Sequence, residues 1–82
     1  MAVVAFFEFP GEPIENYDRG IERDADAKRG QPDRTFHVCF ETEDGWAVLD
    51  VWESEEALER FGEVLGLPPE RQPRVYRVHN MM

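Results

Sequence analysis

The apolar positions of the chain fall into four short runs and two spaced stripes. The runs are Met1–Phe9, Thr35–Thr42, Trp46–Glu53 and Arg74–His79, in which Val, Phe and Trp are frequent. Runs of this length and composition, bounded by Gly, Pro, Asn or Asp, are typical of β-strands. The pattern therefore predicts four strands.

A helix is predicted between the first two strands. Its apolar stripe consists of Ile14, Tyr17, Ile21 and Ala25, at spacings of three and four residues. This spacing places the four side chains on one helix face. Pro13 suits the first turn of this helix, where a missing N–H is harmless, and we expect the helix to end near Lys28.

A second helix is predicted after the third strand. Ser54 is a suitable N-cap, and the acidic residues that follow it suit the positive end of a helix. The apolar stripe of this helix consists of Leu58, Phe61 and Leu65. Gly66, which two prolines follow shortly afterwards, is expected to end it.

The order of these elements is β-α-β-β-α-β. With right-handed crossovers, this order predicts a four-stranded antiparallel sheet with both helices on one face, the ferredoxin-like α+β fold. The length of 82 residues is that of one domain. We therefore expect a single domain over residues 1–82.

The turn between the second and third strands predicts a register. Asp44-Gly45 between two β-rich runs is a strong hairpin signal. A two-residue turn at that point gives the opposing pairs Glu43–Trp46, Cys39–Asp50 and His37–Trp52. Because side chains alternate along a strand, this register also divides the hairpin into two faces.

One predicted face is almost entirely apolar, and we expect the helices to pack on it. It carries Phe36, Val38, Phe40, Leu49 and Val51. The opposite face carries His37, Cys39, Trp46, Val48, Asp50 and Trp52, and the first strand is expected to add Val4 and Phe6. Burying each large apolar side chain is worth about 1.5–3 kcal/mol, so we expect a second copy of the chain to cover this opposite face.

The charge of the chain excludes several kinds of partner. Nine basic and eighteen acidic side chains give a formal net charge of −9. Nucleic acids and anionic membrane surfaces are bound through clustered Lys and Arg, so neither partner is expected. No run approaches the length of a membrane span, and the single cysteine, Cys39, excludes an internal disulfide. A cytoplasmic location is the resulting expectation.

His37 and Asp50 are the candidate catalytic residues. An imidazole titrates near neutral pH and can act as a general base, and Asp50, between Trp46 and Trp52 on the same face, could form a proton-transfer pair with it. The alternative is a structural ion pair, in which Asp50 is satisfied by His37, His79 or Arg77 within the core of a dimer.

Trp46 and Trp52 are candidate ligand-binding residues, with Arg77 and His79 beside them on the predicted face. The two indoles could hold a flat aromatic ligand, or they could simply form the dimer core. Cys39 lies near the candidate catalytic pair, but a free cysteine is usually a small buried hydrophobe. No metal site is therefore expected.

Three segments resemble the antibiotic-biosynthesis monooxygenase-like dimeric α/β-barrel superfamily. Asp50–Phe61 is similar to its strand-to-helix signature, in which a Trp closes the third strand before an acidic helix start. The turn Glu43–Trp46 and the terminal Val78–Asn80 are similar to small actinobacterial members. The resemblance covers essentially the whole chain.

The resemblance implies a homodimer whose sheets form a barrel, with a cleft between sheet and helices in each half. Trp52 matches the Trp that lines this cleft in several members. Phe61 stands where haem-degrading members have His, which argues against a haem role, and no cofactor is expected. The implied function is a cofactor-independent oxygenase or isomerase-like enzyme acting on a hydrophobic or aromatic small molecule. The alternative is a non-catalytic dimeric binding or accessory module.

Overall fold

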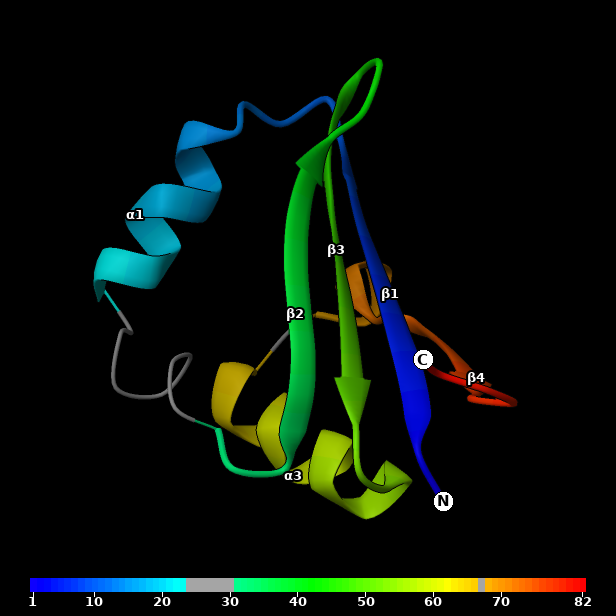
Figure 1. Ribbon diagram of the computed structural model, residues 1–82. Helices are drawn as coiled ribbons and strands as arrows, with labels where there is room; N and C mark the ends of the chain where they lie inside the picture. The colour runs from blue at the N-terminus through cyan, green and yellow to red at the C-terminus, as the bar shows by residue number, and fades with distance from the viewer. Residues whose placement is uncertain (24–30, 67) are drawn as a thin grey trace.

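A computed structural model of the protein describes residues 1–23, 31–66 and 68–82. Its strands are β1 (Val3–Pro10), β2 (Arg34–Glu41), β3 (Gly45–Trp52) and β4 (Arg74–Arg77). Its helices are α1 (Glu15–Arg23), α3 (Glu55–Leu65) and the short 3-10 helix η1 (Pro69–Arg71). Figure 1 shows α1 beside the hairpin end of the sheet and α3 near the opposite end of the strands.

The four strands form one antiparallel sheet in the order β2-β3-β1-β4. β1 and β3 are therefore central, and each helix-containing connection joins strands that are not neighbours in the sheet. This arrangement confirms the ferredoxin-like fold expected from the order of the elements.

The ends of α3 lie where the sequence predicts them. The Ser54 side chain accepts a hydrogen bond from the backbone N–H of Ala57 at 3.2 Å, and Gly66 ends the helix in the left-handed conformation with φ 63°. For α1, the predicted residues Ala25 and Lys28 lie outside the described part of the chain. Within that part, no helix has the length and apolar character needed to span a membrane.

The predicted hairpin register is wrong by two residues. In the structure His37 pairs with Asp50, Cys39 with Val48 and Glu41 with Trp46. The turn is centred on Glu43-Asp44 and is closed by a hydrogen bond from the Thr42 N–H to the Gly45 carbonyl at 2.9 Å.

A glycine is therefore required at position 45 by the packing of neighbouring strands and not by the conformation of the turn. A Cβ atom at Gly45 would lie 2.2 Å from the carbonyl oxygen of Phe9 on β1. The glycine allows β1 and β3 to approach each other at this point. The Asp-Gly pair has a different structural role from the one that the hairpin signal indicates.

The helices cover the opposite sheet face from the one predicted. A shift of two residues preserves the alternation of side chains, so the two sets of hairpin residues remain on separate faces. The core between sheet and helices, however, contains Val3, Ala5, Phe7, Trp46, Val48, Trp52, Ala57, Leu58 and Phe61. Trp46, Val48 and Trp52 are consequently not available as a dimer surface, and Val4 and Phe6 lie on the other face.

The sheet face that the helices leave open is rich in exposed apolar side chains. Phe36 is 49% exposed, Phe40 39% and Tyr76 55%. Val38 is also exposed, and it lies opposite the half-buried Leu49 on the neighbouring strand. The predicted packing of these residues against α1 and α3 is wrong, because they belong to the face away from the helices.

Candidate functional site

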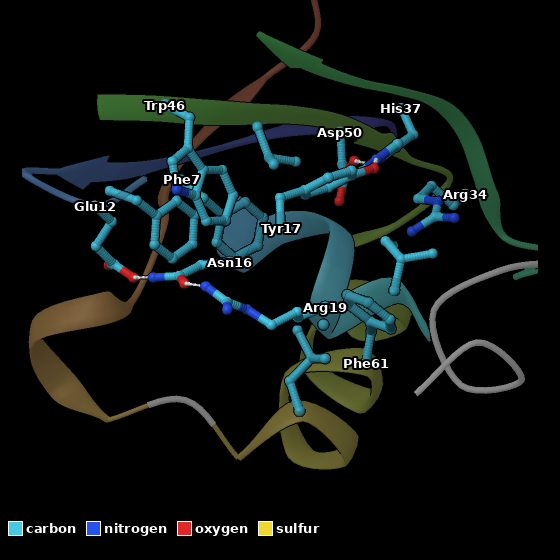
Figure 2. Close-up of a pocket in the computed structure, with 15 residues that line it drawn as sticks. Phe7, Glu12, Asn16, Tyr17, Arg19, Arg34, His37, Trp46, Asp50 and Phe61 are labelled. Atoms are coloured by element: carbon cyan, nitrogen blue, oxygen red, sulfur yellow. Dashed lines mark hydrogen bonds and ion pairs between the residues drawn. The ribbon is translucent and has the colours of Figure 1, made fainter. Parts of the chain in front are cut away.

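A pocket of about 450 Å³ lies between the sheet and the helices. Side chains from β1, α1, β2, β3 and α3 line it, as Figure 2 shows. The walls are partly aromatic, with Phe7, Phe9, Trp46 and Phe61 among the lining residues. Pockets for small organic molecules are commonly of this size and composition.

Three polar side chains form a hydrogen-bonded chain along one wall of this pocket. Nδ1 of His37 lies 2.5 Å from Oδ1 of Asp50, and Nε2 of His37 lies 2.7 Å from the Tyr17 hydroxyl. Asp50 is only 2% exposed, whereas the His37 side chain is 27% exposed. The chain therefore runs from a buried carboxylate toward the pocket (Figure 2).

The chemistry of these groups assigns the hydrogen-bond directions. An ionised carboxylate can only accept, so His37 donates from Nδ1 to Asp50. Nε2 of a neutral His37 then accepts the Tyr17 O–H. Burial raises the pKa of Tyr17, and the nearby Cys39 and Asp50 add to this effect while Arg34 opposes it. The neutral phenol is therefore the form that the site favours.

A second polar chain belongs to the opposite side of the pocket. The Asn16 amide donates to Glu12 at 3.1 Å, and Arg19 donates to the Asn16 carbonyl at 2.6 Å. Glu12 also forms an ion pair with Arg71 at 2.5 Å. These contacts fix the polar side of α1 next to the aromatic residues (Figure 2).

The structure brings three of the six candidate residues to the pocket. His37, Asp50 and Trp46 line it. The Trp46 ring stacks on Phe9 with centroids 3.9 Å apart. Its indole N–H is buried and has no hydrogen-bond partner among the described residues.

The other three candidate residues lie elsewhere. Trp52 is 1% exposed and packs against Phe61 at a centroid distance of 4.8 Å, beneath the lining residues. Arg77 and His79 are exposed near the end of β4, away from the pocket lining. Trp52 thus supports the pocket from behind, while the β4 residues belong to a different surface.

Cys39 does not form part of a metal site in the described structure. Within residues 1–23, 31–66 and 68–82, no group of three His, Cys, Asp or Glu side chains is arranged to hold a metal ion. Burial, followed by the charges of Asp18 and Glu41, raises the pKa of the Cys39 thiol. The thiol therefore resembles a partly buried apolar side chain more than a reactive one.

Two solved structures are similar to this chain over nearly their full length. A haem-degrading protein from Mycobacterium tuberculosis, solved free of haem, shares 20% identity with a TM-score of 0.65, covering 100% of this chain and 99% of its own. A cofactor-independent oxygenase from Streptomyces nogalater shares 14% identity with a TM-score of 0.58, covering 99% and 94%. No protein-family model and no curated protein sequence matches the chain.

The chain therefore shares the fold of these two proteins. The fold implied by the resemblance of Asp50–Phe61 is thus confirmed. Identities of 20% and 14% do not transfer an activity, so the function has to be argued from the pocket itself.

Among the pocket residues that the sequence pattern missed as functional candidates, Tyr17 and Arg34 lie at the same end of the pocket as His37. Tyr17 belongs to the apolar stripe of α1, and its spacing alone marks it as a core residue. Its contact with His37 can be recognised only when it is known which face of the sheet α1 covers. Arg34 lies at the start of β2, where a local irregularity in pairing decides its orientation.

Proposed function

We propose that the protein is a cofactor-independent enzyme that removes a proton from a flat, hydrophobic aromatic substrate. The observation that carries this proposal is the position of His37, held between the buried Asp50 and Tyr17 at the wall of an aromatic pocket. A histidine oriented by a carboxylate is an arrangement that suits general-base catalysis. The fold similarity to a cofactor-independent oxygenase supports the same class.

Tyr17 and His37 act together in the proposed proton transfer. Because Nε2 of His37 accepts the Tyr17 O–H, a substrate proton moves to the Tyr17 oxygen as the Tyr17 proton moves to His37. Asp50 stabilises the resulting imidazolium. The substrate is left as a carbanion that is conjugated with its ring system.

Molecular oxygen completes the reaction without a cofactor. The carbanion transfers one electron to O₂, and the two radicals combine to form a C–O bond. The peroxide takes back the proton from His37 through Tyr17. Loss of water from this hydroperoxide gives a ketone, so that one CH₂ group and one O₂ become one C=O group and one water.

Haem is a poorer candidate for the pocket. Phe61, which the resemblance places where haem-degrading members have His, is 6% exposed and packs on Trp52. A phenyl ring offers no lone pair to iron. The similarity to a haem-degrading protein therefore supports the fold of this chain and not a haem reaction.

The second candidate is a binding module without catalysis. It is favoured by the completeness of the Tyr17–His37–Asp50 chain, in which both ring nitrogens of His37 already have partners. Such a chain could serve only to satisfy buried polar groups. Binding without turnover distinguishes this candidate from the enzyme.

A homodimer is also part of the proposal, formed through the sheet face opposite the helices. The residues that carry it are Val4, Phe6, Phe36, Val38, Phe40 and Tyr76. Burial of this surface would remove several exposed aromatic side chains from water. The cytoplasmic location expected from the sequence remains a prediction.

Anthrone is a suitable test substrate, since it is a polycyclic ketone with an acidic CH₂ group. The wild-type protein should accelerate O₂ uptake and form anthraquinone in equal amounts. His37→Gln should lose this acceleration, whereas His79→Gln, which changes the other histidine far from the pocket lining, should retain it. Tight binding of anthrone with no acceleration would favour the binding module.

A further inference from the structure

A β-bulge directs Arg34 toward the pocket. The pairing of β2 with β3 shifts by one residue between Arg34 and Phe36, so that Arg34 lies opposite Trp52 and Phe36 lies opposite Val51. In an unbroken strand, Arg34 would share the open face with Phe36. The extra residue, Thr35, is exposed, and Arg34 instead lines the pocket. Bulges often re-aim a side chain beside a functional site.

Arg34 is held there by aromatic rings. Its guanidinium lies 5.9 Å from the Trp52 ring centroid and 5.8 Å from the Phe61 centroid. Figure 2 shows Arg34 at the same end of the pocket as His37 and Asp50. Its charge also acts against the effect of burial on the pKa of Tyr17. A cation therefore acts electrostatically on the site of proton transfer.

Arginine side chains in the pocket are unexpected in a chain with so few basic residues. The protein carries a net charge of −9, yet two of its arginines, Arg19 and Arg34, line the pocket. Arg19 is exposed and donates to Asn16 on the other side of the pocket, whereas Arg34 lies at the end of the pocket that holds His37 and Asp50.

We propose that Arg34 binds an anionic oxygen of the ligand, so that the pocket selects aromatic acids over neutral aromatic molecules. This proposal rests on the proposed function and names the substrate class for the same pocket. The guanidinium forms charge-assisted hydrogen bonds with a carboxylate or phenolate. The same contact would stabilise the oxygen of an enolate formed when the substrate loses its proton.

The test compares 2-naphthoate with the neutral 2-naphthamide, which has the same ring system and nearly the same shape. Binding is measured by titration calorimetry and needs no turnover. We expect 2-naphthoate to bind at least about tenfold more tightly, as one charge-assisted hydrogen-bond pair allows. Arg34→Gln should weaken the binding of 2-naphthoate by about tenfold more than that of 2-naphthamide and so remove this preference, with thermal unfolding used to verify that the variant is folded.

A variant with the same net charge as the wild type tests whether the preference depends on the position of the cation or only on its charge. Arg34→Gln combined with Thr35→Arg restores the net charge but places the cation on an exposed residue. It should not recover the preference. Recovery in this variant, or equal affinity of the wild type for both probes, would overturn the role of Arg34 without touching the proton-transfer proposal. Failure of both probes to bind, together with no turnover of anthrone, would overturn both.

Discussion

The Tyr17 hydroxyl of α1 lies 2.7 Å from Nε2 of His37 on β2. This contact joins a helix to the edge strand of the sheet and closes one wall of the pocket. It also occupies the nitrogen through which His37 would otherwise reach a substrate. In the proposed reaction, Tyr17 therefore faces the substrate and His37 holds the transferred proton.

Tyr17→Phe tests this division directly. Removal of the hydroxyl interrupts the path of the proton, so anthrone turnover should fall by about 10²–10⁴-fold, the usual range for a lost acid–base group. The affinity for 2-naphthol should change little, because the phenyl ring keeps its contact with Trp46. Faster turnover in Tyr17→Phe would instead mean that Tyr17 blocks His37.

The raised pKa of Tyr17 predicts a pH dependence. In a Tyr76→Phe variant, Tyr17 is the remaining tyrosine, and its phenolate absorbance should appear at a higher pH than the usual value of 10.0. Because folding favours the neutral phenol, this stabilisation is complete below about pH 10 and is lost as the pH rises through the folded-state pKa. Ionisation of Tyr17 at or below its usual pKa would contradict the burial of its hydroxyl.

The open sheet face can be tested with a matched pair of valines. Val38→Asp places a charge within the proposed dimer surface and should give a monomer in analytical ultracentrifugation. Val64→Asp makes the same change on α3, where Val64 is 64% exposed, and should remain dimeric. A wild-type protein that sediments as a monomer at micromolar concentration would refute the interface.

Two glycines provide a test of the sheet packing. Gly45→Ala should cost about 1–3 kcal/mol of unfolding free energy, because its Cβ would overlap the Phe9 carbonyl. Gly62→Ala, which has open space around it in α3, should instead stabilise the protein by up to about 1 kcal/mol. Denaturant unfolding of both variants measures the difference, and equal stability would show that β1 and β3 do not approach closely at Gly45.

The order of elements and the ends of α3 could be predicted because they depend on local sequence. Ser54 and Gly66 act within one helical turn of their own positions, and capping chemistry is short-ranged. The division of β2 and β3 into two faces was also predictable, since a register error of two residues leaves the alternation intact.

The choice of face for the helices could not be predicted in the same way. Both faces of the hairpin are apolar, and β1 is apolar at almost every position. The pattern of β1 therefore does not indicate which of its side chains face the helices. Val3, Ala5 and Phe7 face the helices, whereas Val4 and Phe6 do not. The position of Gly45 was misleading because a close strand approach, and not a turn, requires the glycine.

The pairing of His37 with Asp50 was expected as an alternative to catalysis, and it follows from the corrected register, which places the two residues directly opposite each other. The place of Arg34 in the pocket could not be predicted because a bulge turns its side chain to the sheet face opposite the one that regular strand alternation gives. The role of Tyr17 could not be predicted because its hydroxyl meets His37 only through the packing of α1 on the sheet. In each case a long-range contact determines the role of the residue.

The most direct test of the account is the effect of Asp50→Asn on anthrone turnover, measured together with the affinity for 2-naphthol. Asparagine keeps the shape of Asp50 but removes the charge that stabilises the imidazolium form of His37. If Asp50 stabilises the imidazolium during the reaction, kcat falls by about 10²–10⁴-fold, while ligand affinity and the dimer are retained. Unchanged kcat per folded molecule, with only a lower unfolding free energy, would show that Asp50 and His37 are a structural pair and would contradict the proposed function.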